Sequence, residues 1–444
     1  MTDWREELLA DLRPLAVTSD AVTSDAVRTG SVTVGGQPAV VVAWDFAARG
    51  GSFGERDATA FVEAVAYAAR ESLPLLSLVR SGGTRLQEGM RALVGIPRAL
   101  LALDDLAAAG QPHIAVADHP TTGGVWVLVA SKSDVRIGVA GATVGFSGPR
   151  AIEAMTGVAV AGGTAESALG AGLLDVVAEP ADMVRVISDV LTTLRPDTPE
   201  AVDPSTTVDT STRRGWEQVA YSRAVQRPSG ARLLADLLGD SAVPLRGADA
   251  SVTAAIGRVH GRRVIVAGAG ERAGRITPAG YRLVVRAAGL ASRLNTSLVT
   301  LIDTAGADPL PASEQAAVAA AIGDAMSAVL HTTSPTIAIV HGDGGSGGAL
   351  ALAVTDVVAV TDTGWFAALA PEGAAATLRT TPQEAADLMR VAPLDLIADG
   401  FADAVVSTDV DTLRQWIAAT CDHPPAGRRE RWRAPLGHSP RRRV

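Results

Sequence analysis

Cysteine, lysine and aromatic residues are scarce in this chain of 444 residues, and these scarcities exclude whole classes of protein. With Cys421 as the single cysteine, a disulfide framework and a zinc site built on several thiolates are both excluded, and no metal is expected. No run of about 18 apolar residues occurs, so no membrane span is expected. What is abundant is glycine, with 45 residues, in a chain whose 47% hydrophobic content is typical of large globular cores.

The charge balance is acidic, with a formal net charge of −9, which argues against nucleic acid as the main partner. The N-terminal segment 1–15 is acidic and amphipathic, and it lacks the basic and apolar blocks of a signal peptide. We therefore expect a cytoplasmic enzyme. The arginine-rich segment 425–444 has little apolar periodicity, so we predict an exposed basic tail there.

The same order of predicted strands and helices occurs twice, over 31–185 and again over 252–410. Each copy opens with two β-branched runs joined at a turn, Gly35-Gly36 in the first and His260-Gly261 in the second. An alanine-rich helix follows, then a short apolar strand with a special loop, another helix, and a strand that ends in glycines. Two copies of this β-β-α spiral predict an α/β protein with two similar domains.

The stretch between the copies, 195–215, is rich in Pro, Ser, Thr and Asp, which predicts an exposed linker. The expected organisation is therefore an N-terminal arm over 1–30, a first domain over 31–194 and a second domain over 216–424. The two domains then have about 160 and about 210 residues, sizes that each support a core.

Strands that end in paired glycines and lead into a helix carry the candidate chemistry. Glycine allows a sharp turn and a close approach of the backbone to a ligand. The free N–H groups at the start of the next helix face one point and favour negative charge there, so two of them can form an oxyanion hole. The candidates are Gly82-Gly83 and Gly123-Gly124 in the first copy, and Gly344-Gly345 and Gly347-Gly348-Ala349 in the second.

Other catalytic groups have weaker support. Ser346 stands between glycines but shows no pattern of Asp and His partners, so a hydrolase nucleophile is disfavoured. His119 and His341 precede the glycine turns, and a polar wall position is favoured for both over a catalytic base. Glu88 and Glu372 lie beside the loops and are expected to cap a helix or anchor a loop.

Nucleotide signatures are weak: no Walker A motif occurs, and the GxGxxG spacing occurs once, as GDGGSG over 342–347, which alone does not indicate a nucleotide site. The seven histidines show no ligand spacing such as HExxH. An inventory of many amide donors and few acids or bases suits the stabilisation of an enolate at a thioester.

These residues resemble a known family, the carboxyltransferase of bacterial acetyl-CoA carboxylase, over about 31–410. The first half is similar to its β subunit, through SGGTRLQEG (81–89), PTTGGV (120–125) and VGFSGPRAIE (144–153). The second half is similar to its α subunit, through LIDTAGADPLPASEQ (301–315), GDGGSGGALALAV (342–354) and APEGAAATL (370–378).

The resemblance implies two tandem crotonase-like (ClpP/crotonase) domains, β-like and then α-like. It also implies transfer of a carboxyl group from carboxybiotin to the α-carbon of acetyl-CoA or a related short acyl-CoA, through an enolate. The acyl-CoA site is expected mainly on the first domain, while carboxybiotin approaches the second domain of another protomer. A homodimer or larger homo-oligomer is therefore expected, in which backbone amides hold two developing oxyanions.

Residue by residue, the resemblance assigns Gly82, Gly83, Gly123 and Gly124 to the thioester enolate. It assigns Gly347, Gly348 and Ala349 to the ureido oxygen of biotin. Arg85 is expected to help place CoA or the carboxyl group. Further substrate contacts are expected from Gly148, Arg150, Gly306, Glu372 and Gly373.

Biotin itself is expected on a separate protein. A biotin carrier domain needs a lysine in a tight hairpin turn, whereas the single lysine, Lys132, lies in the middle of the first domain. The expected partners are therefore a biotin carboxyl carrier protein and a biotin carboxylase subunit.

The chain also departs from the family. Residues 1–30 contain no cysteine, so the zinc ribbon of the bacterial β subunit is absent there. Ala305 stands where the family usually has proline, and Asp308 where an aromatic-proline pair is expected nearby. These changes leave open a specialised carboxylase with another acyl-CoA.

Two alternatives remain open beside the carboxyltransferase. A biotin-independent decarboxylase of a malonyl thioester needs the same enolate hole but no biotin. A non-catalytic scaffold subunit is a different class, and the retained glycine turns argue against it, because a scaffold needs no close approach of backbone to a ligand.

Overall fold

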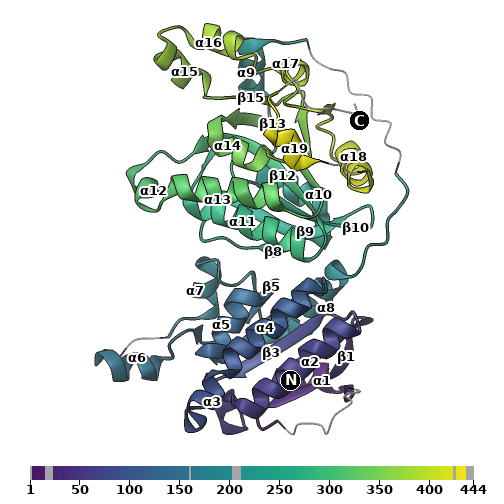
Figure 1. Cartoon of the computed structure of the whole chain (residues 1–444), viewed down its shortest axis with the longest axis vertical. Helices are drawn as coiled ribbons and strands as arrows, with labels where there is room; N and C mark the ends of the chain where they lie inside the picture. The colour runs from purple at the N-terminus through teal and green to yellow at the C-terminus, as the bar shows by residue number, and fades with distance from the viewer. Residues whose placement is uncertain (1–2, 16–23, 160–161, 203–211, 424–426, 437–444) are drawn as a thin grey trace. The chain divides into compact units, whose positions relative to one another are not determined.

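The computed structural model describes residues 3–15, 24–159, 162–202, 212–423 and 427–436. The chain divides into two compact units, Met1–Arg195 and Pro196–Val444, and each is considered by itself (Figure 1). The division falls at the start of the predicted linker.

Unit 1 contains one seven-stranded sheet. Its strands are β1 (Val27–Val34), β2 (Gln37–Trp44), β3 (Leu75–Ser81), β4 (His113–Thr122), β5 (Val135–Val139), β6 (Val144–Gly145) and β7 (Val176–Ala178). The hydrogen-bonded path is β1-β2-β3-β4-β5-β7, with β6 paired to β4. β1 and β2 form an antiparallel hairpin, and the strands after it are parallel.

Unit 1 also contains eight α-helices among its described residues. They are α1 (Trp4–Leu9), α2 (Glu55–Arg70), α3 (Met90–Leu93), α4 (Gly95–Ala108), α5 (Gly124–Lys132), α6 (Pro149–Thr156), α7 (Ala165–Gly170) and α8 (Met183–Leu194). α2 and α4 pack side by side over the strands, and α8 packs on the β1–β2 hairpin. The rings of Trp44, Phe53 and Phe61 meet beneath α2, with centroids 5.9 to 6.2 Å apart.

Unit 2 contains one nine-stranded sheet. Its strands are β8 (Val243–Leu245), β9 (Val252–Val259), β10 (Arg262–Ala269), β11 (Gly274–Ile276), β12 (Ser297–Ala307), β13 (Thr336–Gly345), β14 (Val357–Thr361), β15 (Trp365–Ala367) and β16 (Ala404–Val406). The path is β8-β9-β10-β12-β13-β14-β16, with β11 paired to β12 and β15 to β13.

The helices of unit 2 surround its sheet. They are α9 (Gly215–Ala224), α10 (Gly230–Leu238), α11 (Pro278–Arg293), α12 (Pro311–Gln315), α13 (Val318–His331), α14 (Ser346–Ala353), α15 (Pro371–Leu378), α16 (Pro382–Met389), α17 (Pro393–Ala398), α18 (Val410–Asp422) and α19 (Arg428–Arg433). α11 and α13 pack together, as do α10 and α18. Among the described residues, no helix is both long and apolar enough to cross a membrane.

The two sheets share one topology. β1-β2-β3-β4-β5-β7 in unit 1 corresponds to β9-β10-β12-β13-β14-β16 in unit 2, a hairpin followed by parallel strands. Both hairpins turn at the predicted pair, with φ of 56° and 79° at Gly35 and Gly36 and of 45° and 75° at His260 and Gly261. Positive φ at both central residues is the geometry that matches the twist of a hairpin. The predicted repeat and the crotonase-like α/β fold are confirmed.

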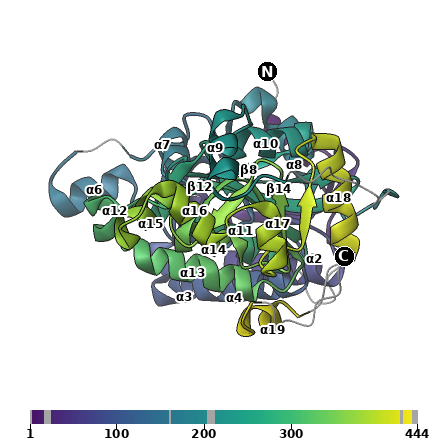
Figure 2. The ribbon, with the colours of Figure 1, turned by 90° about the horizontal axis from the view of Figure 1, so that it is seen from above.

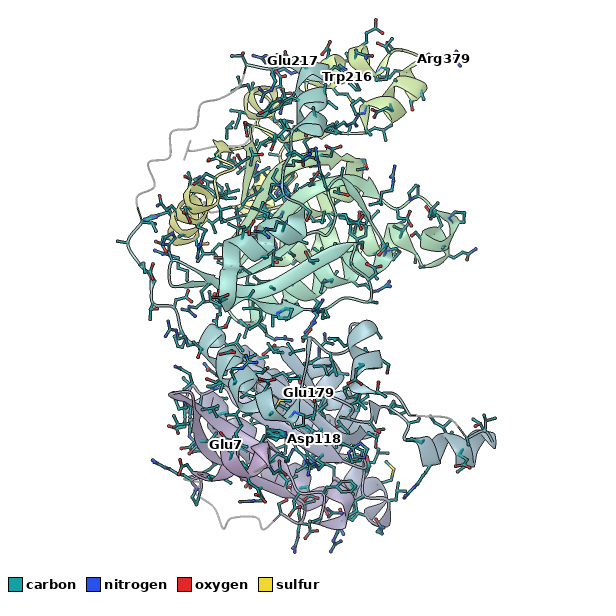
Figure 3. All side chains as sticks on the ribbon, turned by 180° about the vertical axis from the view of Figure 1, so that it is seen from behind. Glu7, Asp118, Glu179, Trp216, Glu217 and Arg379 are labelled. Carbon is teal, nitrogen blue, oxygen red and sulfur yellow. The ribbon has the colours of Figure 1, made fainter. Side chains whose placement is uncertain are left out.

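The first domain extends into the predicted N-terminal arm. α1 packs on β1 and α8, and β1 already begins at Val27. Arg5 is 7% exposed, and its guanidinium donates to the carbonyl oxygen of Trp44 at 2.8 Å and to Asp118 at 3.4 Å. Figure 3 shows Asp118 among the strands of unit 1. The described part of the predicted arm over 1–30 is therefore packed on the first domain, where the buried arginine has its carboxylate partner.

The predicted linker is only partly independent of the domains. Residues 195–201 are exposed, as expected. However, the amides of Thr198 and Glu200 donate to the carbonyl oxygens of Gly261 and His260 at 3.1 and 3.0 Å. This part of the linker is thus attached to the β9–β10 turn, while 203–211 lie outside the described residues.

The prediction of an exposed basic tail is wrong for α19. The guanidinium of Arg428 donates to both carboxylate oxygens of Asp356, at 3.0 and 2.6 Å, and to carbonyl oxygens at the end of α13. Arg431 pairs with Asp403 at 2.5 Å, and the indole of Trp432 donates to the carbonyl oxygen of Thr355. The arginines recognise buried acceptors that sequence periodicity does not reveal. Residues 437–444 lie outside the described part.

Replacing Arg428 by alanine is expected to destabilise unit 2 by about 2–3 kcal/mol, because it leaves the nearly buried Asp356 without its cation. The loss stays moderate because the amide and hydroxyl of Thr336 still donate to Asp356. Urea unfolding of the full chain, followed by hydrogen exchange of peptides from unit 2, measures it. Arg429→Ala removes an exposed arginine of the same helix and is the matched control; equal effects of the two changes would contradict the prediction.

Candidate active site

The first glycine loop follows β3 and is held by the hydroxyl of Ser81. This hydroxyl donates to the carbonyl oxygen of Gly51 at 2.7 Å and accepts from the amide of Gly83 at 3.1 Å. Gly83 has φ +106°, a conformation that residues with a side chain rarely adopt. The amide of Gly82 donates to the carbonyl oxygen of Gly50 at 3.0 Å. The loop is therefore shaped by its own hydrogen bonds.

The second glycine turn begins α5 and packs backbone to backbone on the first. A Cβ added to Gly123 would lie 2.9 Å from the Cα of Gly83. The structure thus brings the two predicted turns of unit 1 together. However, the amide of Gly123 donates to the carbonyl oxygen of Phe146 at 2.9 Å. Because the amides of Gly82, Gly83 and Gly123 already have acceptors, the assignment of these three as oxyanion donors is wrong; they permit the close packing instead.

Two amides beside this contact have no hydrogen-bond acceptor in the described part of the chain, those of Thr84 and Gly124. Gly124 is the first residue of α5, where N–H groups lack an acceptor within the helix. Thr84 pairs with Phe53 in a parallel β-bridge. In this bridge the amide of Phe53 donates to Gly83 and the amide of Arg85 donates to Phe53, so the amide of Thr84 is not used. A Cβ added to Gly124 would lie 3.2 Å from the Oγ1 of Thr84. These neighbouring amides form the candidate oxyanion site of unit 1.

Sequence reasoning missed Thr84 because it searched for glycine. The available signal was the hydroxyl residue two positions before the last glycine of the loop, Ser81 before Gly83. That hydroxyl accepts the hydrogen bond of the Gly83 amide, so the amide of the next residue, Thr84, is the one left without an acceptor.

Unit 2 repeats the arrangement with Thr304 in place of Ser81. The hydroxyl of Thr304 donates to the carbonyl oxygen of Gly274 at 2.6 Å and accepts from the amide of Gly306 at 3.0 Å. Gly306 has φ +106°, and a Cβ there would lie 2.8 Å from the carbonyl oxygen of Gly345. Gly306 therefore has a packing role equivalent to that of Gly83, and its amide is not free for the substrate contact expected from the sequence.

The start of α14 carries the candidate amides of unit 2. Ser346 turns the chain from β13 into the helix with φ 62°. Gly347 and Gly348 follow, at positions whose N–H groups have no acceptor within the helix. A Cβ added to Gly347 would meet nothing within 4 Å, so open space adjoins this turn. Ala349 is 0% exposed and lies one residue deeper, which leaves Gly347 and Gly348 as the donors.

Arg85 does not point to a substrate. Its side chain is 1% exposed, and its five N–H groups are all used within unit 1. The acceptors are the hydroxyl and carbonyl oxygens of Ser52 and the carboxylates of Asp25, Asp57 and Glu88. The prediction that Arg85 places CoA or the carboxyl group is therefore wrong: it ties the glycine loop to the start of α2. Glu88 accepts from the amide of Glu55 at 2.7 Å, which confirms its expected role as a helix cap.

Gly148 lies closer than Arg150 to the glycine turns of unit 1. Gly148 precedes α6, and a Cβ there would lie 3.9 Å from the side chain of Thr122, just before the turn at Gly123. Arg150 is an exposed residue of α6, which projects from the rest of unit 1 (Figures 1 and 2). Only Gly148 is thus brought close to the candidate site.

Glu372 and Gly373 belong to α15. Glu372 pairs with Arg223 of α9, with 2.5 Å between Oε1 and Nη1, and a Cβ on Gly373 would lie 3.2 Å from Leu369. Figure 3 shows Trp216 and Glu217 of α9 at the end of unit 2 where α15 and α16 lie, apart from α14 in Figure 1. Glu372 therefore anchors a loop, the role favoured from the sequence, and the substrate contacts expected of both residues are not supported.

The histidines take no part in a nucleophile system. The exposed ring of His119 accepts from the amide of Thr143 at 3.2 Å. His341 is 3% exposed, and burial lowers its pKa to about 4 despite the neighbouring Asp303. Within the described residues, no imidazole is hydrogen-bonded to Ser346. The arrangement therefore offers amides and no activated hydroxyl.

Two cavities lie away from the glycine turns. One, of about 350 Å³, adjoins α1 in unit 1 and is lined by Arg28, Phe46 and Arg80 among others. The other, of about 230 Å³, lies in unit 2 beside His341. None of the predicted glycines lines either cavity.

Comparison with known proteins finds relatives that match most of this chain. A family described as acetyl co-enzyme A carboxylase carboxyltransferase-like matches residues 205–422. A β/α carboxyl transferase of acetyl-coenzyme A carboxylase from Salinispora tropica is 34% identical over 407 residues, covering 84% of this chain and 72% of that protein.

The chain belongs to the carboxyltransferase family of acetyl- and acyl-coenzyme A carboxylases.

Further members of this carboxyltransferase family match over most of their length. The probable biotin-dependent acyl-coenzyme A carboxylase beta3 subunit of Mycobacterium tuberculosis is 34% identical over 385 residues, covering 84% of this chain and 77% of that protein. The structure of transcarboxylase 12S with methylmalonyl-coenzyme A matches with a TM-score of 0.77 and 24% identity, over 95% of this chain and 89% of that one. This structural likeness establishes the carboxyltransferase fold.

Proposed function

We propose that this carboxyltransferase moves a carboxyl group from carboxybiotin to the α-carbon of an acyl-CoA. The observation that carries the proposal is that each unit has amides without an acceptor at its glycine turns, Thr84 with Gly124 in unit 1 and Gly347 with Gly348 in unit 2. Each site includes the start of a helix beside a close glycine contact, where the helix dipole also favours negative oxygen. Removal of the α-proton of a thioester places charge on its carbonyl oxygen, which such amides stabilise.

We assign the amides of unit 1 to the thioester oxygen and those of unit 2 to the ureido oxygen of biotin. The residues of unit 2 fit a neutral urea group, because the site offers N–H donors and open space beside Gly347. When bound there, carboxybiotin supplies the carboxyl group. The chain's own task is to orient the two reactants and to hold the two oxygens.

The partners follow from this assignment. Biotin is carried by a separate carrier protein, which a biotin carboxylase subunit loads. We further propose that copies of this chain assemble into a homo-oligomer in the cytoplasm, with the two amide sites of an active centre contributed by different protomers.

An assay with malonyl-CoA tests the proposal against the decarboxylase alternative. The purified chain is incubated with malonyl-CoA, with and without free biotin, and acetyl-CoA is measured. We expect the rate to rise at least about tenfold with biotin, because biotin is then the acceptor. Rapid acetyl-CoA formation at an equal rate without biotin would replace the carboxyltransferase by a decarboxylase. Repeating the forward reaction with acetyl-, propionyl- and longer acyl-CoAs and a carboxylated carrier identifies the substrate.

A further inference from the structure

Tyr281 carries a hydroxyl that nothing in the described chain uses. The side chain lies on α11 and is 0% exposed, and its Oη has no hydrogen-bond partner among the described residues. Burial raises the pKa of this phenol, so the hydroxyl stays protonated at any ordinary pH. It is therefore a neutral donor with no acceptor.

This hydroxyl lies at the candidate amide site of unit 2. A Cβ added to Gly348 would lie 2.6 Å from the Oη of Tyr281, 2.5 Å from the amide nitrogen of Ala307 and 3.1 Å from the carbonyl carbon of Gly306. The space beside the Cα of Gly348 is thus bounded by this hydroxyl and by the loop after β12. Where β11 pairs with β12, the amide of Asp308 donates to the carbonyl oxygen of Ile276. The amide of Ala307 is therefore not used in this pairing.

Unit 1 lacks this hydroxyl, although its helix is equivalent. α2 and α11 each have 16 residues and follow the hairpin of their unit, so Tyr281, the fourth residue of α11, corresponds to Ala58, the fourth of α2. Ala58 is also 0% exposed and presents only a methyl group. The repeat therefore provides an internal comparison: the same fold forms without a hydroxyl at this position.

A buried hydroxyl without a partner costs stability, and a phenylalanine would fill the same volume without that cost. The hydroxyl is consequently not explained by packing. The start of α14, whose amides have no acceptor in the helix, is the place where a ligand oxygen would provide one.

We propose that Tyr281 donates a third hydrogen bond to the oxygen held by the amides at the start of α14, the ureido oxygen of biotin. This inference rests on the proposed function. It makes the two halves chemically different, since the thioester oxygen in unit 1 is held by backbone amides alone while the biotin oxygen also receives a phenol donor.

Tyr281→Phe tests the assignment in the malonyl-CoA reaction with free biotin. We expect kcat to fall about tenfold, the effect of one lost hydrogen bond in the transition state, while KM for malonyl-CoA stays within about twofold. The melting temperature is expected to stay equal or to rise, because a buried unpaired hydroxyl is removed. Tyr67→Phe makes the same change on α2, away from the glycine turns, and is expected to leave kcat unchanged.

Each possible outcome either supports or overturns the inference about Tyr281. If Tyr281→Phe keeps full kcat, the hydroxyl has no part in catalysis and the inference is wrong. If kcat and the melting temperature both fall, the hydroxyl supports the fold, which also overturns it. If the wild-type chain shows no biotin-dependent transfer, the proposed function itself has failed, and this result is visible before any variant is compared.

Discussion

Carboxyl transfer is expected to fall about 100-fold or more when Gly347 is replaced by valine, with the fold retained. Loss of one oxyanion donor typically costs a factor of about 100 to 1,000 in kcat. A side chain at this position would meet no other atom within 4 Å, and the backbone of Gly347 is not left-handed, so valine fits without strain. Its methyl groups would then occupy the open space through which an oxygen must reach the amides of Gly347 and Gly348. The biotin-dependent rate and the melting temperature together measure the effect.

Gly323→Val is the matched control for this variant. Gly323 is an exposed helical glycine of α13 that also has nothing within 4 Å of an added Cβ. We expect it to leave the rate unchanged. Gly348 is a poorer target, because its added Cβ would lie 2.5 Å from the amide nitrogen of Ala307 and would disturb packing. Full activity of Gly347→Val would favour the scaffold alternative over catalysis at α14.

The repeat and the places of the glycine turns were predictable from the sequence. Hairpin turns, apolar strands and alanine-rich helices are local patterns, and they occur twice in the same order. In the structure the two sheets have the same path, and Gly83 and Gly306 share φ +106°. The paired glycines also indicated correctly where two segments of backbone approach, because only glycine tolerates that contact.

The identity of the free amides was not predictable in the same way. Whether an N–H group is free depends on an acceptor that folding brings from elsewhere, such as Gly50 for Gly82 or Phe146 for Gly123. Composition and spacing contain no such information. The hydroxyls of Ser81 and Thr304 show how a position two residues away decides which amide remains open.

The structural roles of Arg85 and Arg428 were not predictable for a related reason. A charged residue in a glycine-rich loop suggests an exposed binding group, since arginine is rarely buried. Arg85 and Arg428 are instead surrounded by acceptors from distant segments, from residue 25 to residue 57 for Arg85 and from α13 to Asp356 for Arg428. Only the folded chain reveals these partners.

Arg85→Ala is expected to destabilise unit 1 by about 3–5 kcal/mol, because it leaves the fully buried carboxylate of Asp57 without a cation. Burial alone would raise the pKa of Asp57, but hydrogen bonds from the amides of Ala26 and Gly54, the hydroxyl of Ser24 and the charge of Arg85 hold it below its ordinary value. Urea unfolding of the full chain, followed by hydrogen exchange of peptides from unit 1, measures the loss. Activity should fall as well, because Arg85 holds the loop that ends at Thr84.

The loss of stability expected for Arg85→Ala depends on pH. A carboxyl group whose pKa is lowered in the folded state stabilises the fold above its unfolded pKa, about 3.9, and this contribution is lost as the pH falls through the folded value. The difference between wild type and Arg85→Ala is therefore expected to be largest near neutral pH and to shrink below about pH 4. Arg70→Ala, which breaks the exposed pair with Glu71, should cost less than about 1 kcal/mol at any pH. If Arg85→Ala costs no more than Arg70→Ala, the arginine does not hold the loop, and a role toward substrate has to be considered again.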